Sequence, residues 1–439
     1  MPTKPTLSLQ SKKTAVLAGH SSTVTILCKL LGSDTPTDLP PRSPLNLALV
    51  LDKSGSMSGR PLEEAKKCAS NIVKRLTEKD KVCVVAYDDK VELVSPLAPV
   101  SSASSVIKQI SSIHCGGMTN LHGGWEMGVN QLRDSLTNDS LSRVLLLSDG
   151  NANAGISDTE EIVKRTANAL DMGVSTSTYG LGEGFNEDLM VQMGNSGGGS
   201  SYYGETANDL DEPFSTEFDL LSSLCAKDIY FDFVSPKHDV KCLNTQIIRK
   251  DKGFQSGNLP YEGAVWLVFE VLVKAEDTDS ETVDLGTLNV QYTDLDGTTH
   301  TLSESFSLPT LSSQAYADLA DNPEVVERVL ELEVSQLQLK AKEAARRHDW
   351  DMVDQLLGRV TAMGANNEWL AGIAAEMRVL AEQRNQHVFM KEAMYSSRQM
   401  QKRTVSSRAY CLSNDTSLEA DDSLPSFMRR KKRQGKKRD

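Results

Sequence analysis

The stretch 45–58 constrains the fold of this chain most strongly. It reads LNLALVLDKSGSMS, a nearly unbroken apolar run that leads into three side chains carrying oxygen, Asp52, Ser54 and Ser56. An apolar run of this length that ends in Ser and Gly is typical of a strand covered by helices on both faces, as in parallel sheets. Because ligands of such sheets bind beyond the carboxyl ends of the strands, we expect a binding site at these three side chains.

These side chains predict a site for a small divalent cation. Asp52 offers a carboxylate, whereas Ser54 and Ser56 offer neutral hydroxyls, so the set carries too little negative charge to fill an octahedral shell alone. Such a set suits Mg²⁺, with Mn²⁺ or Ca²⁺ as alternatives, and leaves a position open for an outside carboxylate. On these residues alone, an ordinary flexible turn in which Asp52 caps a helix is the alternative interpretation.

Strands and helices alternate from residue 45 to residue 224. Buried strands are expected at 82–87, 143–148 and 174–179, with helical periodicity between them. A short strand at 91–96 follows the second strand closely enough to pair with it in an antiparallel hairpin at the sheet edge. The pattern predicts a doubly wound, mostly parallel α/β domain of the Rossmann-like kind.

Two further polar residues follow at the places where this sheet would present them. Thr119 lies in GGMTNL, directly before a helix, and Asp149 lies in LLLSDG, directly after a strand. Together with the segment DKSGS, these residues resemble the von Willebrand factor A (VWA) domain with a complete metal-ion-dependent adhesion site (MIDAS). The likeness is to cytosolic bacterial-type proteins in which such a domain stands between β-rich segments.

The resemblance implies a role for each residue of the predicted site. Ser54 and Ser56 would bind the ion directly through their hydroxyls, and Thr119 would bind directly or through water. Asp52 and Asp149 would act largely through water and hydrogen bonds. The open position would take a Glu or Asp of a partner protein, which agrees with the weak charge of the two hydroxyl ligands.

Other motifs in the same region are interpreted as structural. The GxGxG segment at 180–184 lacks the GxGxxG spacing of a dinucleotide site and follows a late strand, so a turn is favoured. His114, Cys115 and His122 lack a fourth ligand for a soft metal. No motif of a hydrolase, a metalloprotease or a phosphate-binding loop occurs, so we expect a protein that is not an enzyme.

The segments that flank 44–224 predict a second, β-rich structure. Residues 1–43 contain strand-like runs followed by a Pro-rich linker, and residues 225–310 alternate with the period of strands. We expect a β-sandwich at 225–310 that the N-terminal strands complete. In that arrangement the α/β domain is inserted into the sandwich.

The C-terminal part changes character twice. Residues 311–400 have helical periodicity in three segments and predict a small bundle or stack of helical hairpins. Residues 401–439 lose periodicity and predict a disordered tail. The last eleven residues, 429–439, carry a net charge of +7 in a chain whose total is −13, so the rest of the chain carries −20.

The cysteine content and the N-terminal sequence indicate the cellular compartment of the protein. Seven scattered cysteines without a CxxC pair indicate free thiols in a reducing compartment, and the N-terminus lacks the apolar core of a signal peptide. We therefore expect a cytoplasmic protein with no membrane span. An acidic body argues against a broad nucleic-acid-binding surface, although the basic tail can act separately.

The leading hypothesis from the sequence is an intracellular, Mg²⁺-dependent protein-binding module of the adhesion or scaffold type. The first alternative is a protein associated with RNA through its basic tail. The second alternative is an accessory subunit of an ATPase or of a metal-handling complex, because the chain has no nucleotide site of its own.

Overall fold

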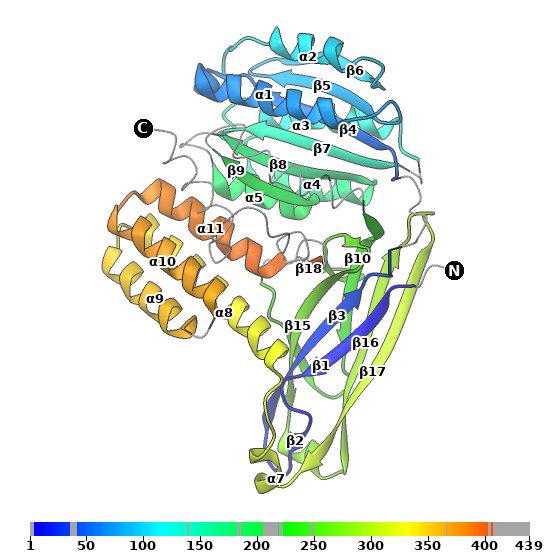
Figure 1. Cartoon of the computed structure of the whole chain (residues 1–439), viewed down its shortest axis with the longest axis vertical. Helices are drawn as coiled ribbons and strands as arrows, with labels where there is room; N and C mark the ends of the chain where they lie inside the picture. Colours follow the sequence, from blue (N-terminus) through cyan, green and yellow to red (C-terminus); the bar gives the residue numbers. More distant parts are fainter. Residues whose placement is uncertain are drawn as a thin grey trace, which may run out of the picture. The chain divides into compact units, whose positions relative to one another are not determined.

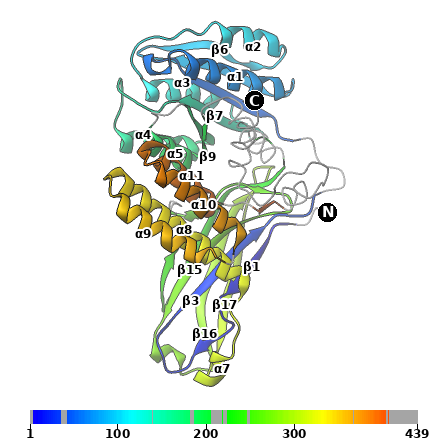
Figure 2. The ribbon, with the colours of Figure 1, turned by 60° about the vertical axis from the view of Figure 1, so that its left-hand side comes forward.

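The computed structural model of the chain describes residues 4–35, 42–137, 140–181, 186–204, 218, 223–245, 249–365, 367–402 and 405–406. The chain divides into two compact units. One unit contains residues 40–223 together with 295–297, and the other contains residues 1–39, 224–294 and 298–439. Figures 1 and 2 show the elements of each unit, coloured along the sequence.

The first unit is built on a mostly parallel sheet. In its described part the strand order is β6-β5-β4-β7-β8-β9. The strands are β4 (Leu45–Asp52), β5 (Lys81–Tyr87), β6 (Val91–Pro99), β7 (Leu141–Ser148), β8 (Val174–Leu181) and β9 (Gly198–Gly204). Only β6 runs antiparallel to its neighbour within this sheet, which confirms the predicted hairpin at the edge. All residues of β4 are buried because it lies in the middle of the sheet.

Helix α3 (Leu121–Arg133) packs so closely on this sheet that two of its positions require glycine. The helices are α1 (Arg60–Arg75), α2 (Ala103–Ser111), α3 (Leu121–Arg133), α4 (Thr159–Asp171) and α5 (Glu187–Ser196). A Cβ atom on Gly124 of α3 would lie 2.3 Å from Tyr87 Cδ1, and one on Gly128 would lie 2.7 Å from Val50 Cγ2. These two glycines therefore allow α3 to lie directly on β4 and β5. Trp125 and Val129 of the same helix complete the core on that face.

One expectation for this unit falls mainly outside the described residues. The sequence pattern predicts a helix at 207–224, of which the structure describes only residues 218, 223 and 224. Leu224 begins strand β10 instead of ending a helix. The glycine run at 197–199 follows a segment of helical periodicity and therefore predicts the end of a helix. Gly197 is the C-cap of α5, and Gly198 opens β9 with a positive φ of 65°.

The second unit contains a β-sandwich. Its described strands are β1 (Thr6–Ser11), β2 (Val16–Leu17), β3 (Ser22–Leu31), β10 (Leu224–Val234), β11 (Asp239–Cys242), β12 (Arg249–Lys250), β13 (Gly253–Gln255), β14 (Leu259–Pro260), β15 (Gly263–Val273), β16 (Thr282–Thr293), β17 (Thr299–Leu311) and β18 (Val405–Ser406). One sheet has the order β1-β3-β15-β11, and the other has the order β12-β13-β10-β16-β17-β2. Ile26, Leu267, Phe231 and Phe269 are among the buried residues that form the core.

The N-terminal strands belong to this sandwich, as expected. Strand β3 pairs antiparallel with β15 along its whole length, from Ser22 opposite Val273 to Leu31 opposite Ala264. Strand β1 pairs with β3, and β2 pairs with β17. The α/β unit therefore lies in the sequence between two strands, β3 and β10, of one sandwich. Within the segment predicted to lack regular structure, β18 pairs with the first residues of β15.

A helical region is joined to the sandwich through helix α8. The helices are α7 (Ser313–Ala317), α8 (Pro323–Arg346), α9 (Trp350–Met363), α10 (Glu368–Glu382) and α11 (Gln386–Lys402). Val325 and Leu332 of α8 pack in one buried cluster with Leu27 of β3 and with Trp266 and Val268 of β15. Helix α8 therefore covers the outer face of the β3–β15 pair.

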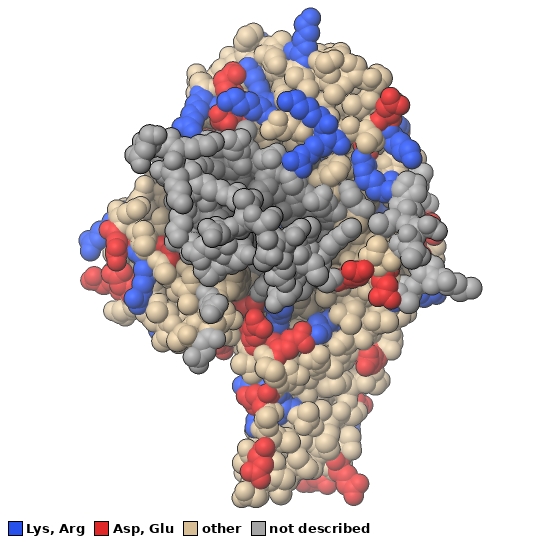
Figure 3. Space-filling model, viewed as in Figure 1, with Lys and Arg blue, Asp and Glu red and all other residues tan. Residues whose placement is uncertain are grey.

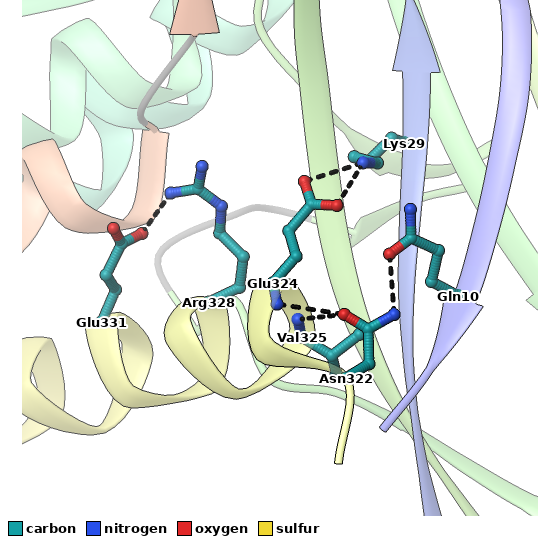
Figure 4. A network of polar contacts seen from close by, with 7 residues as sticks. All are labelled: Gln10, Lys29, Asn322, Glu324, Val325, Arg328 and Glu331. Atoms are coloured by element: carbon teal, nitrogen blue, oxygen red, sulfur yellow. Dashed lines mark hydrogen bonds and ion pairs between the residues drawn. The ribbon is translucent and has the colours of Figure 1, made fainter. Parts of the chain in front are cut away.

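Polar contacts fix the start of α8 on the same surface (Figure 4). Asn322 caps the helix by accepting hydrogen bonds from the backbone N–H groups of Glu324 (3.0 Å) and Val325 (3.3 Å), and its amide donates to Gln10 of β1 (3.0 Å). Lys29 of β3 forms an ion pair with Glu324 at 2.7 Å. The helix thus begins at a residue that is bound to the sheet.

The bundle contains one more long helix than its apolar periodicity predicts. Three helices were expected, and the described residues contain a fourth, α11, which packs on α8. Part of this contact is polar: Ser335 and Ser397 share a hydrogen bond of 2.7 Å, and Gln401 Nε2 donates to Ser335 Oγ at 2.9 Å. In the part of the chain that the structure describes, no helix has both the length and the apolar character needed to cross a membrane.

Charge on the α/β unit is distributed unevenly. Figure 3 shows Lys and Arg side chains over the region where α1 lies. Exposed basic residues of this helix include Arg60, Lys67, Lys74 and Arg75. The acidic total of the chain therefore coexists with a locally basic surface.

Candidate metal centre

The predicted site begins where β4 ends. Asp52 Oδ1 accepts a hydrogen bond from the backbone N–H of Ser54 (2.9 Å), which turns the chain out of the strand. The turn continues into a short 3-10 helix, Gly55–Met57, whose Met57 side chain is fully buried. Ser54 Oγ and Ser56 Oγ lie 3.1 Å apart. The local fold therefore brings both predicted hydroxyl ligands together.

The carboxylate of Asp52 is fully buried behind these hydroxyls. Its Oδ2 accepts hydrogen bonds from Ser148 Oγ (2.6 Å) and from the Tyr87 hydroxyl (3.3 Å). Burial raises the pKa of Asp52, and the nearby charge of Asp149 acts in the same direction, against the hydrogen bonds from Ser148 and Ser54. Asp52 forms no ion pair among the described residues, so a cation beside it would stabilise its charged form.

Thr119 is held by the loop that follows β7. Its backbone N–H donates to Asn153 Oδ1 (2.7 Å), and its carbonyl oxygen accepts from the N–H groups of Asn153 and Ala154, both at 3.1 Å. The residues just before Thr119 are bound to the first loop, because Gly55 N–H donates to the carbonyl of Gly117 at 2.8 Å. Thr119 is 2% exposed and therefore has little freedom to move.

Asp149 follows the last residue of β7. Its Oδ1 accepts a hydrogen bond from the N–H of Asn151 (3.1 Å), and its carbonyl accepts from the N–H of Asn186 (2.8 Å). The preceding residue, Ser148, accepts from the N–H of Gly150 (2.8 Å) while it donates to Asp52. Ser148 thus joins the end of β7 to the end of β4.

The arrangement of the hydroxyls fits a small hard cation. In an octahedral shell with metal–oxygen distances of about 2.0–2.1 Å, neighbouring oxygens lie roughly 2.9 Å apart, whereas Ca²⁺ distances give roughly 3.3–3.7 Å. The separation of 3.1 Å between Ser54 Oγ and Ser56 Oγ lies midway between these two sets of values, so it admits a small hard cation without selecting one. The hydrogen bonds of Asp52, Ser54, Thr119 and Asp149 described above all involve oxygen and nitrogen atoms, and Asp52 provides a buried carboxylate.

Sequence reasoning missed three residues of this site: Tyr87, Ser148 and Asn153. Tyr87 and Ser148 are the last residues of β5 and β7, so their positions at the carboxyl edge of the sheet were the available signal. Asn153 offered a weaker signal, because it stands in the NAN segment after Asp149.

The competing motifs have other environments. Residues 182–185 of the GxGxG segment lie outside the described residues. Cys115 Sγ donates to the carbonyl oxygen of Ser54 (2.9 Å), and His122 is buried beside Trp125. Within the described ranges, no three His, Cys, Asp or Glu residues are grouped so as to hold a metal ion.

Comparison with known proteins identifies the class of the α/β unit. Residues 46–216 match the sequence model of the von Willebrand factor type A domain, so the chain contains a domain of this kind. An uncharacterized protein of Synechocystis sp. is 32% identical over 183 residues, which are 42% of this chain and 43% of that protein. The Escherichia coli protein YfbK is 29% identical over 202 residues, 46% of this chain and 35% of that protein. The chain spans less than half of the length of these relatives.

The likeness in fold extends beyond this domain. A solved structure described as von Willebrand factor type A from Catenulispora acidiphila has a TM-score of 0.70 at 14% identity, over 90% of this chain and 97% of that chain. At this identity the likeness concerns the fold alone. The VWA-type sheet with its helices and the C-terminal helical region are therefore shared.

Proposed function

We propose that this chain is a Mg²⁺-dependent protein-binding module whose metal centre captures an Asp or Glu carboxylate of a partner protein. Domains of the von Willebrand factor type A commonly mediate interactions between proteins. The observation that carries the proposal is the pair of hydroxyls of Ser54 and Ser56, 3.1 Å apart, in front of the fully buried carboxylate of Asp52.

In this proposal the residues divide into two groups. Ser54 and Ser56 hold Mg²⁺ through their hydroxyl oxygens, and Thr119 holds it directly or through water. Asp52 and Asp149 act through water, because their carboxylates already accept hydrogen bonds from the protein. The bound ion supplies an electrophilic position that an external carboxylate can fill.

The side from which a partner would approach is the side of Ser56. Ser56 is exposed, whereas Asp52, Ser54, Thr119 and Asp149 are buried. Negative charge therefore lies behind the ion, and the solvent side carries a neutral hydroxyl. This order weakens repulsion of an incoming carboxylate.

The proposal assigns no catalytic residue. The hydroxyls of Ser54 and Ser56 contact one another, and among the described residues no His or Lys side chain donates to or accepts from them. We propose a scaffold-type role in the cytoplasm, which buried cysteine thiols support: Cys28, Cys83 and Cys225 are not joined in disulfides.

The metal centre is tested by titrating Mg²⁺ into the metal-free protein by calorimetry. We expect the wild type to bind the ion and Asp52→Ala and Ser54→Ala to lose at least about tenfold in affinity. Asp134→Ala is the control, because this carboxylate is 83% exposed. Equal affinity of the wild type and Ser54→Ala would contradict the assignment.

Partner capture is tested separately by affinity purification with Mg²⁺ and with EDTA, followed by mass spectrometry. A partner that depends on Mg²⁺ and is lost with Ser54→Ala supports the proposal, and replacement of a single acidic residue of that partner should abolish binding. Capture that persists in EDTA but is lost when residues 428–439 are removed would favour the alternative of RNA binding through the tail.

A further inference from the structure

Asp88 joins the two loops that carry the predicted metal ligands. This residue follows the end of β5 and is 5% exposed. Its Oδ2 accepts hydrogen bonds from Lys53 Nζ (2.8 Å) and from the N–H of Gly117 (3.3 Å). Its backbone carbonyl accepts from the N–H of Asn120 (2.8 Å). Lys53 belongs to the first loop, and Gly117 and Asn120 lie on either side of Thr119.

The second loop is shaped to approach this carboxylate. A Cβ atom on Gly116 would lie 1.7 Å from Asp88 Oδ2, so a larger residue would have to displace either the Asp88 carboxylate or the loop. The N–H of Gly116 donates to the carbonyl of Lys53 (2.7 Å). The same residue therefore makes both the close approach to Asp88 and the hydrogen bond between the loops.

The charge on Asp88 is well supported. Burial alone would raise the pKa of Asp88, but the hydrogen bonds from Lys53 and from the N–H groups of Lys90 and Gly117 outweigh it and lower this pKa. Asp88 is thus an anion with a fixed orientation at neutral pH. Lys53 is 14% exposed in its side chain, so the ion pair is largely withdrawn from solvent.

We propose that Asp88 is the positioning residue of the metal centre: it holds the loop 116–120 against the loop 52–56, and so places Thr119 beside Ser54 and Ser56. This inference rests on the proposed function for its meaning, because Thr119 is a ligand only if the centre binds metal. Asp88 acts through Lys53, Gly117 and Asn120, none of which is a predicted metal ligand.

The test compares Asp88→Ala with Asp89→Asn in the full chain. Asp89 is the adjacent carboxylate, is exposed, and makes no hydrogen bond or ion pair among the described residues, so its variant changes the same charge at nearly the same place. We expect Asp88→Ala to weaken Mg²⁺ binding at least about tenfold, and Asp89→Asn to leave it within about twofold.

A second readout follows the loop itself in EDTA. Cys115 is an exposed thiol whose Sγ donates to the carbonyl of Ser54, so its alkylation reports whether the two loops are in contact. We expect Asp88→Ala to be alkylated at Cys115 several times faster than the wild type. Asp89→Asn should react at the wild-type rate. A change in overall stability alone would not produce this local difference.

Each outcome decides between the possibilities. If Asp88→Ala leaves both Mg²⁺ affinity and the alkylation rate unchanged, or if Asp89→Asn matches it, Asp88 has no positioning role. If the wild type binds no Mg²⁺, the proposed function fails, while the alkylation rates in EDTA still show whether Asp88 holds the loop. Asp88→Asn, which keeps the size and one acceptor oxygen, should lie between wild type and Asp88→Ala and serves if the alanine variant does not fold.

Discussion

Arg42 and Asp80 form a two-point contact that fixes the start of the central strand. The Arg42 guanidinium donates to both carboxylate oxygens of Asp80, at 2.6 and 2.5 Å. Asp80 is fully buried and also accepts hydrogen bonds from the N–H groups of Leu45 (2.9 Å) and Thr77 (2.7 Å). One carboxylate thus ties the first residue of β4 to the turn after α1.

Removal of this carboxylate is expected to destabilise the α/β unit. Asp80→Ala leaves the N–H groups of Leu45 and Thr77 without their acceptor and should lower the free energy of unfolding by about 3–5 kcal/mol. Hydrogen exchange of peptides from β4 and β5 measures the effect, with peptides from β15 as the internal reference. Glu161→Ala is the control, since its pair with Arg165 is exposed and screened by solvent, so its loss should change the stability much less. A loss of the same size in both variants would contradict the prediction.

The same residue predicts a dependence of stability on pH. Burial would raise the pKa of Asp80, but the hydrogen bonds from Arg42, Thr77 and Leu45 outweigh it, so the folded-state pKa lies below the unfolded value of about 3.9. The stabilisation is therefore present above that unfolded pKa and is lost as pH falls through the folded pKa. We expect the stability difference between wild type and Asp80→Asn to be constant above about pH 5 and to shrink below about pH 4. Chemical unfolding at a series of pH values tests this, and a difference that does not change down to pH 3 would exclude it.

The sequence predicts those parts of the structure that depend on local pattern. The VWA-type sheet could be predicted because an apolar run and the small residues at its end, as in 45–58, are neighbours in the chain. The contacts of Ser148 with Asp52 and of Asn153 with Thr119 could not, because they join residues far apart and depend on strand register. Helix α11 was not recognised because it packs on α8 partly through Ser397 and Gln401, which weakens its apolar periodicity.

Ser148 provides a test of the surroundings of Asp52. Ser148→Ala removes the 2.6 Å hydrogen bond to Asp52 Oδ2 and should weaken Mg²⁺ binding about tenfold. Thr178→Val is the matched control: its hydroxyl is equally buried and donates to the carbonyl of Met190 (2.8 Å), away from Asp52. Calorimetry should show reduced Mg²⁺ affinity for Ser148→Ala only. The thermal unfolding temperature should be lower than that of the wild type in both variants. Reduced affinity in both would indicate a general loss of structure.

Asn322 is expected to control how α8 is held on the sandwich. Asn322→Ala removes the helix cap and the contact with Gln10, and should cost about 1–2 kcal/mol in stability of this unit. Hydrogen exchange should become faster at the start of α8 and also in β1. In helix α10, the side chain of Asn367 caps the first turn by accepting a hydrogen bond from the backbone N–H of Leu370. Asn367→Ala removes this cap and should affect that helix alone. No change in β1 with Asn322→Ala would show that the contact with Gln10 contributes nothing.

The sandwich core is expected to depend on the N-terminal strand β3. Ile26 is fully buried in the core and lies opposite Phe269 of β15, so Ile26→Ala should lower the stability of this unit by about 2–5 kcal/mol. Thr25→Ala is the control on the same strand, because Thr25 is only half-buried. The stability of both variants is measured by denaturant unfolding, and the protection of β15 is measured by hydrogen exchange. Unchanged exchange in β15 with Ile26→Ala would contradict a shared core.

The pairing of β3 with β15 also sets the order in which this protein can fold during its synthesis. After Leu31 leaves the ribosome, its partner Ala264 does not exist until the whole inserted domain has been translated, which takes on the order of tens of seconds at about 5–20 residues per second. Throughout this interval β3 can pair with β1 but not with β15. The α/β unit is therefore complete, and free to fold, before the sandwich that frames it in the sequence can close.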